Sequence, residues 1–79
     1  MKLNILYFGL IAEAIKCTQE EFILENETTV KQLKDILINK YTELEKLSYQ
    51  IAVNQKLASP DTLITNNSEI AILPPFAGG

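Results

Sequence analysis

The last seven residues, LPPFAGG at positions 73–79, carry the clearest candidate chemistry in the sequence. Ala77, Gly78 and Gly79 have almost no side chain, so nothing crowds the α-carboxylate of Gly79. A carboxylate is a poor electrophile until another protein activates it, for example by adenylation with ATP. The activated carboxyl can then react with an amine to give an isopeptide bond, or accept sulfur from a donor to become a thiocarboxylate.

The residues before the glycines predict a stiff and narrow tail. Pro74 and Pro75 fix φ and disfavour helix in the residue before each of them, so the tail should leave the domain extended. The five residues after Pro74 reach at most about 17 Å, and the last three would pass through a narrow tunnel. Phe76 is a candidate anchor for a partner's pocket, because aromatic side chains often fill such pockets. The alternatives are that Phe76 folds back on Leu73 or the sheet edge, and that the terminal glycines are a frayed end.

The rest of the sequence lacks the usual catalytic side chains. It has no histidine and one cysteine, which excludes Ser-His and Cys-His nucleophile pairs and the usual zinc ligand sets. The only glycines are Gly9, Gly78 and Gly79, so the chain has no glycine-rich phosphate loop. A persulfide or redox role for Cys17 is conceivable, but we interpret it as an incidental thiol because nothing around it indicates activation. We therefore expect no metal and no bound cofactor, with the terminal carboxyl as the reactive group.

Composition excludes several classes of function. The chain has 79 residues, which make one domain, and 47% of them are hydrophobic, enough for a single core. Its net charge is −3 and its seven lysines are spread along the chain, which argues against nucleic-acid binding and a polybasic membrane anchor. No apolar run approaches the roughly 20 residues of a membrane span, and the start MKLNI lacks the features of a signal peptide. We expect a cytoplasmic location.

Two strands and a short helix are predicted before residue 26. Residues 2–8 open with the alternation of a strand, and both faces are partly apolar, as in a central strand or one covered on both sides. The apolar residues are Leu3, Ile5 and Tyr7 on one face, and Leu6 and Phe8 on the other. Gly9 ends this strand, residues 10–16 have short helical character, and residues 20–25 predict a second strand.

The clearest helix in the sequence spans about residues 29–40. Thr29 and Gln32 have the spacing of a capping box, in which each side chain bonds to the backbone N–H of the other residue. Apolar residues then recur at intervals of three and four, which predicts a face packed against the core. These residues are Val30, Leu33, Leu37, Tyr41 and Leu44, with Ile36 beside them.

The second half of the chain predicts short elements. In chain order they are a strand at 48–53, a turn at 54–55, a brief strand at 56–58, a turn at 59–61, a helical or 3₁₀ turn at 61–64, a turn at 66–68 and a last strand at 69–73. The glutamates are interpreted as solvated, with an acidic surface for an activating enzyme as the alternative. They are Glu20, Glu21, Glu43 and Glu45.

These elements predict an α+β fold of the ubiquitin-like β-grasp type. Placing the last strand beside the first puts two strands with apolar residues on both faces at the centre of a mixed sheet. The main helix then crosses one face of the sheet, as the right-handed crossover rule favours. We expect a β-grasp domain over residues 1–74 and an extended, flexible Gly-Gly tail at residues 75–79.

Over essentially its whole length, the chain resembles the small subunits of molybdopterin synthase, which are ubiquitin-like sulfur carriers. The most specific part is the ending, where Leu-Pro-Pro is combined with Gly-Gly, whereas VNQ and the helix cap recur in related carriers. The segments that carry the resemblance are KLNILYFG at 2–9, TTVKQLKDIL at 28–37, IAVNQ at 51–55, NSEIAILPP at 67–75 and FAGG at 76–79.

The resemblance implies a role for Gly79 in molybdenum cofactor biosynthesis. A ubiquitin-activating-type adenylyltransferase would use ATP to adenylate Gly79, and a sulfur donor protein would then supply the sulfur of a thiocarboxylate. Ala77 and Gly78 would thread into the large subunit of molybdopterin synthase, which would supply the catalytic side chains. Sulfur would pass to cyclic pyranopterin monophosphate, and two deliveries would make the dithiolene of molybdopterin. The chain would thus be the sulfur-donating subunit of a sulfurtransferase, a heterotetramer of two small and two large subunits.

Three residues are expected to contact the partner: Phe8, Pro75 and Phe76. Leu10 and Ile11 would extend the surface around Phe8. The alternative for Phe8, Leu10 and Ile11 is a place in the core. Three other functions stay open, namely a sulfur carrier for thiamine thiazole synthesis, a ubiquitin-like protein modifier joined to lysines, and a plain binding module. Thiamine carriers share the Gly-Gly end but are usually shorter and lack the Pro-Pro pair.

Overall fold

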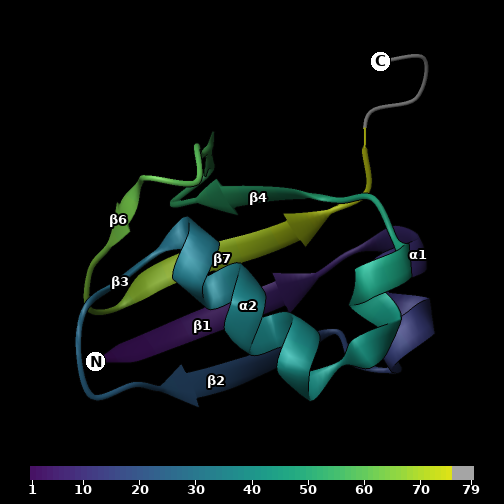
Figure 1. Cartoon of the computed structure of the whole chain (residues 1–79), viewed down its shortest axis with the longest axis horizontal. Coiled ribbons are helices and arrows are strands. Elements are labelled where there is room, and N and C mark those ends of the chain that lie inside the picture. Colours follow the sequence, from purple (N-terminus) through teal and green to yellow (C-terminus); the bar gives the residue numbers. More distant parts are fainter. Residues whose placement is uncertain (76–79) are drawn as a thin grey trace.

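In a computed structural model of the chain, residues 1–75 are described, and Figure 1 shows their arrangement. The elements in chain order are β1 (Lys2–Tyr7), α1 (Gly9–Ile15), β2 (Gln19–Ile23), β3 (Thr28–Thr29), α2 (Val30–Lys40), the 3₁₀ helix η1 (Thr42–Lys46), β4 (Gln50–Val53), β5 (Lys56–Leu57), β6 (Leu63–Ile64) and β7 (Ser68–Leu73).

A five-stranded mixed sheet forms one layer of the domain. Its strand order is β2-β1-β7-β4-β5, and β1 and β7 run parallel at the centre while the other pairs are antiparallel. The helix α2 lies across one face of this sheet (Figure 1). The predictions that the last strand lies beside the first, and that the main helix crosses one face, are confirmed. This is the β-grasp architecture.

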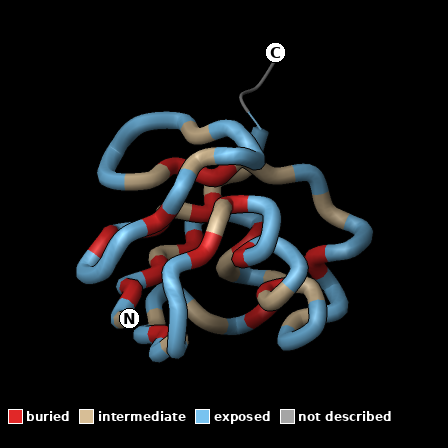
Figure 2. The backbone as a smooth tube through the Cα atoms, turned by 60° about the vertical axis from the view of Figure 1, so that its left-hand side comes forward, coloured by how far each residue is buried: buried red, intermediate tan, exposed pale blue. Residues whose placement is uncertain are grey.

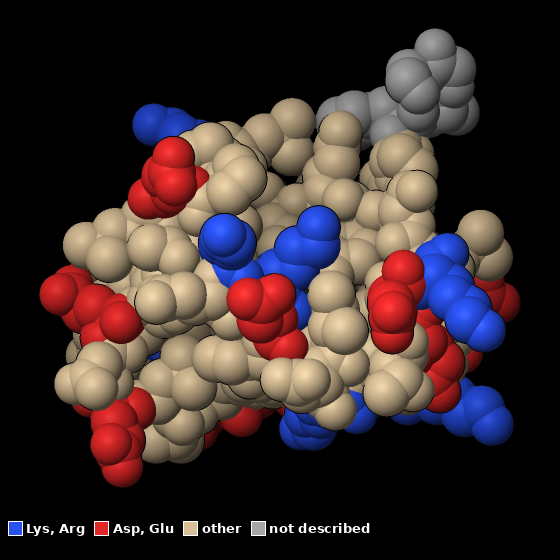
Figure 3. Space-filling view, in the orientation of Figure 1, with Lys and Arg blue, Asp and Glu red and all other residues tan. Residues whose placement is uncertain are grey.

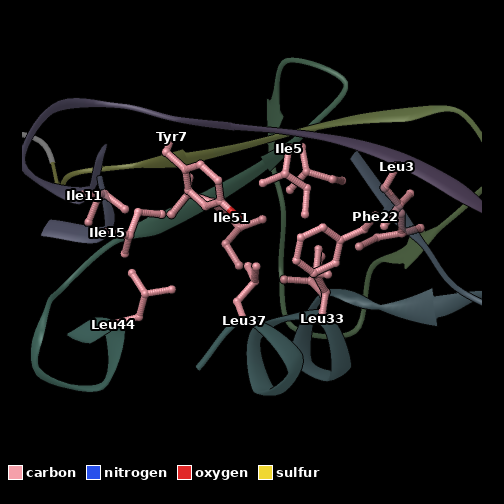
Figure 4. Packing of buried hydrophobic residues seen from close by; sticks show 14 residues of the cluster. Leu3, Ile5, Tyr7, Ile11, Ile15, Phe22, Leu33, Leu37, Leu44 and Ile51 are labelled. Carbon is pink, nitrogen blue, oxygen red and sulfur yellow. The ribbon is translucent and has the colours of Figure 1, made fainter. Parts of the chain in front are cut away.

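The core lies between α2 and the sheet. Leu33 and Leu37 are fully buried and point from α2 toward Ile5, Phe22 and Ile51 on the strands (Figure 4). Buried positions gather in the interior, whereas exposed positions follow the loops and outer turns (Figure 2). Burying one Leu or Ile side chain contributes about 1.5–3 kcal/mol, so this cluster supplies most of the driving force for folding. Its members are Leu3, Ile5, Tyr7, Ile11, Ile15, Phe22, Val30, Leu33, Leu37, Leu44, Ile51, Ile64, Ile70 and Ile72.

The start of α2 is fixed by its own residues. The backbone N–H of Gln32 donates to the Thr29 hydroxyl at 3.2 Å, and the Thr29 N–H donates to the Gln32 side-chain oxygen at 3.0 Å. The predicted capping box is therefore confirmed. The helix ends at Lys40 because Tyr41 is extended, and Leu44, predicted on the same apolar stripe, is buried from η1 instead.

The turn between β4 and β5 is also determined by neighbouring residues. Asn54 and Gln55 both have positive φ, at 51° and 72°, which is the backbone of a two-residue hairpin turn that matches the strand twist. The turn sets the register, so Val53 faces Lys56 and Ala52 faces Leu57. The turn predicted at 54–55 is confirmed.

The predicted helical or 3₁₀ turn at 61–64 is wrong. Leu63 and Ile64 form β6, which pairs antiparallel with Thr28 and Thr29 of β3. The backbone N–H of Val30 also donates to the Thr62 carbonyl at 3.0 Å. The backbone of residues 62–64 therefore makes its hydrogen bonds to a segment more than thirty residues away in the chain. A local sequence pattern cannot predict such a pairing.

Candidate functional site

The C-terminal tail leaves the sheet beside the end of β1. β7 ends at Leu73, and the N–H of Phe8 donates to the Ile72 carbonyl at 3.1 Å, which holds the two strand ends together. Gly9 has φ +57°, and a Cβ placed there would lie 3.0 Å from Pro74 Cγ. Gly9 therefore serves two purposes, because it turns the chain into α1 and leaves room for Pro74 as the tail departs.

Four of the residues predicted to form the site lie outside the described residues. They are Phe76, Ala77, Gly78 and Gly79. The last described residue is Pro75, which is exposed, as a partner contact requires. The roles assigned to these five residues, and the domain boundary at residue 74, stay predictions.

One row of apolar side chains crosses the sheet on the face opposite α2. Leu6 pairs with Ala71 across β1 and β7, Ala71 pairs with Ala52 across β7 and β4, and Ala52 pairs with Leu57 across β4 and β5. These four residues share a face because paired residues point to the same side of a sheet. Leu57 is 58% exposed at the sheet edge, so the row reaches solvent.

A second, shorter row lies nearer the tail. Phe8 follows Tyr7, which pairs with Ile72, so alternation places Phe8 and Leu73 on the same outer side as Leu6. Phe8 is 44% exposed. The outer-face patch is defined here by Leu6, Phe8, Ala52, Leu57, Ala71 and Leu73. Phe8 and Leu57 are its exposed members, Ala52 is buried, and the other three are partly exposed, so the patch is a candidate interaction surface.

The structure separates the three residues predicted near the end of β1. Phe8 and Leu10 are exposed, at 44% and 68%, whereas Ile11 is buried in the core at 1%. The alternative prediction, a place in the core, is therefore the correct one for Ile11. Leu57 was missed by the sequence reasoning, since its face depends on the hairpin register. The two-residue turn at Asn54-Gln55 is the signal that could have revealed it.

Glu20 is a correction to the prediction that the glutamates are solvated. Its carboxylate accepts hydrogen bonds from the hydroxyl of Tyr7 at 2.6 Å, the hydroxyl of Tyr41 at 2.7 Å and the ammonium of Lys40 at 2.8 Å. These contacts join β1, β2 and the end of α2. By contrast, Glu21, Glu43 and Glu45 are exposed, as predicted.

The cluster around Glu20 shifts the titration of its members. Burial favours the neutral form of Glu20, but the hydrogen bonds from Lys40, Tyr7 and Tyr41 outweigh burial and lower its pKa. Burial and the hydrogen bond to the Glu20 carboxylate raise the pKa values of Tyr7 and Tyr41. Cys17 is partly buried nearby, and its thiol donates to the Gln19 carbonyl at 3.3 Å. The cluster thus holds the sheet to the end of α2.

Within residues 1–75, no helix is both long and apolar enough to cross a membrane.

Comparisons with known proteins agree on the family. The sequence profile of the ThiS family matches residues 5–79. A molybdopterin synthase sulfur carrier subunit from Mycobacterium tuberculosis is 40% identical over 82 residues, which cover 100% of this chain and 99% of that protein. Among solved structures, a complex of subunits 1 and 2 of molybdopterin-converting factor from Helicobacter pylori contains a chain that is 28% identical, with a TM-score of 0.71 and full coverage of both chains.

The fold itself is shared more widely. SAMP1 from Haloferax volcanii superposes with a TM-score of 0.84 over all of both chains, at 19% identity, which is evidence for the fold alone. The fold likeness, the profile match and the full-length relative at 40% identity all converge. The chain therefore belongs to the ThiS family, and within it to the molybdopterin synthase sulfur carrier subunits.

Proposed function

We propose that the chain donates sulfur from a thiocarboxylate on Gly79 to cyclic pyranopterin monophosphate, forming the dithiolene of molybdopterin. The observation that carries this proposal is the position of the tail exit. The exposed Pro75 follows directly on the outer-face patch, so docking of this patch would deliver the C-terminus to the same partner. The folded domain binds the partner and thereby positions the reactive C-terminus.

The chemistry begins at the terminal carboxyl. A carboxylate oxygen of Gly79 attacks the α-phosphate of ATP on an adenylyltransferase, and pyrophosphate leaves. The outer sulfur of a persulfide on the donor protein then displaces AMP from the acyl carbon and forms an acyl disulfide. A thiol of the donor cleaves this disulfide, which releases the thiocarboxylate and leaves the donor as a disulfide. The chain itself binds no cofactor in this scheme, because ATP belongs to the activating enzyme.

The large subunit of molybdopterin synthase is the proposed partner for transfer. The two-subunit complex from Helicobacter pylori supports this, since one of its chains resembles this protein over its full length. Phe8, Leu57 and Leu73 on the outer-face patch would contact the large subunit, while Ala77 and Gly78 pass into its active site. The catalytic side chains would come from the large subunit, in a heterotetramer with two copies of each subunit.

Intact mass spectrometry tests the proposal directly. The protein is incubated with the adenylyltransferase, ATP and a sulfur donor, and a species should form that is heavier by the difference between a sulfur and an oxygen atom. A variant lacking Gly79 is the matched control, and it should keep its fold but form no such species. Absence of the heavier species from the intact chain under these conditions rejects a carrier function.

The substrate is tested in a second step. The sulfur-loaded protein is mixed with the large subunit and cyclic pyranopterin monophosphate, and molybdopterin should appear as the heavier species disappears. Sulfur loading without this transfer would instead favour the carrier for thiamine thiazole synthesis. Attachment of the activated chain to lysines of other proteins, in place of sulfur loading, would favour a ubiquitin-like modifier.

A further inference from the structure

A groove lies on the α2 side of the sheet, opposite the outer-face patch. It encloses about 620 Å³ between α2, the start of β4 and the chain that follows β5. Figure 3 shows this hollow as an uncharged surface beside lysine side chains that rise from α2. Its main walls are Val30, Lys31 and Lys34 from α2, and Tyr49, Ile51 and Ala58 from the strand side. Leu57 lies at its edge and borders the outer-face patch as well.

The two charged residues that line the groove are both lysines, although the whole chain is acidic. Lys31 and Lys34 are three residues apart on α2, so they project from neighbouring positions on one side of the helix. Neither makes an ion pair with any carboxylate of residues 1–75. The Lys34 ammonium lies 5.3 Å from the centre of the Tyr49 ring, which keeps it at the groove. Burial raises the pKa of Tyr49, and the negative charge of the nearby Asp35 raises it further.

The strand side of the groove leaves hydrogen-bonding groups without partners. β5 pairs with Ala52 and Val53, and the Ala58 N–H donates to the Ile51 carbonyl at 3.0 Å. Among the described residues, no strand therefore neighbours the outer edge of β4 at Gln50. The Tyr49 hydroxyl is buried and makes no hydrogen bond to residues 1–75, so no such bond fixes the ring that forms this wall. Open strand edges are templates for a further extended segment.

We propose that this groove binds an extended acidic segment of a partner protein. An apolar side chain of that segment occupies the hollow, its carboxylates lie against Lys31 and Lys34, and its backbone passes Gln50 at the outer edge of β4. Charge complementarity between the two lysines and the acidic flanks sets the specificity. The groove and the outer-face patch share Leu57 at their border, so a partner bound at one site lies close to the other. The proposal does not rest on the proposed function.

A titration followed by amide NMR tests this binding. The probe is an acetylated and amidated peptide, Glu-Asp-Val-Ile-Val-Asp-Glu, and the control peptide replaces each acid by its amide. The acidic peptide should shift the amides that line the groove, with an affinity that falls as salt increases. The amide peptide should bind at least several-fold more weakly. A pentamer of deoxythymidine carries the same charge as the peptide without a β-forming backbone and should not bind.

Paired variants separate the groove from general charge. Replacing both Lys31 and Lys34 by Gln should weaken peptide binding roughly 3- to 30-fold, the range expected for two exposed ion pairs. Lys46→Gln removes an exposed lysine from η1, away from the groove, and should change little. Ala58→Phe should fill the hollow and abolish binding while thermal unfolding confirms a folded protein. Shifts that map mainly to Leu6, Phe8 and Ala71 of the outer-face patch would overturn the proposal. Equal binding of the oligonucleotide, an equal loss in Lys46→Gln, or no binding at millimolar peptide would overturn it as well.

Discussion

Replacing Glu20 by Ala should destabilise the fold far more than a surface glutamate would. Its side chain is 17% exposed and accepts three hydrogen bonds, two of them from tyrosines. The substitution leaves the Tyr7 hydroxyl without its partner, in a residue that is 3% exposed. A hydrogen bond to a charged group contributes about 1.5–3 kcal/mol, and neighbouring bonds are not additive. We therefore expect a loss of about 2–4 kcal/mol.

Glu21 is the matched control for this experiment. It neighbours Glu20 on β2 but is exposed, and its one ion pair to Lys2 spans 3.2 Å with both side chains about half exposed, at 49% and 50%. Such pairs contribute about 0–1 kcal/mol. Urea unfolding followed by circular dichroism should therefore separate Glu20→Ala from Glu21→Ala by at least 1 kcal/mol. Equal stability of the two variants would refute a structural role for the Glu20 cluster.

The same cluster predicts a dependence of stability on pH. The pKa of Glu20 is lower in the folded protein than its ordinary value of about 4.3, so the unfolded state binds more protons in that range. Its contribution is present above the unfolded pKa and is lost as pH falls through the folded pKa. The wild-type protein should lose stability below about pH 5 more steeply than Glu20→Gln, because the amide does not titrate. Parallel acid profiles for the two proteins would contradict this.

Three further predictions concern the tail exit, the docking surface and the helix start. Gly9→Ala should cost about 1–3 kcal/mol, measured by urea unfolding, because it combines a positive φ with a contact to Pro74 Cγ at 3.0 Å. An unchanged midpoint would show that Pro74 moves aside freely. Phe8→Ala should barely change thermal stability but weaken binding to the large subunit by about 2 kcal/mol in calorimetry, whereas Ile23→Ala, an exposed residue of β2, should leave binding unchanged. Thr29→Ala should cost about 1 kcal/mol by removing the cap that bonds the Gln32 N–H, and a cost below 0.3 kcal/mol would mean that packing alone sets the helix start.

The parts of the fold that follow from short-range spacing were predictable. The capping box at Thr29 and Gln32, the core stripe of α2 and the turn at Asn54 and Gln55 each depend on residues within a few positions of one another. The pairing of the first and last strands was also predictable, because both carry apolar residues on two faces and therefore belong at the centre of a sheet.

Pairings between distant segments were not predictable in this way. Leu63 and Ile64 become a strand only because Thr28 and Thr29 lie beside them. The lowered pKa of Glu20 depends on hydrogen bonds from Lys40, Tyr7 and Tyr41, which lie 13 to 21 residues away in the chain. The outer-face patch also depends on three strand registers that must all hold together.

The sequence by itself predicted the kind of chemistry this protein can take part in. A chain without histidine, with one cysteine and with a bare Gly-Gly end has the terminal carboxyl as its clearest candidate for a reactive group. Only the tertiary structure decided the surroundings of Pro74 and Pro75, where the described part of the chain leaves the sheet. It placed Pro74 against Gly9, set Phe8 and Leu57 on one open face, and turned Ile11 into the core. The physical reason is that the choice between exposure and burial depends on which strands pair and in which register, and those contacts join residues far apart in the chain.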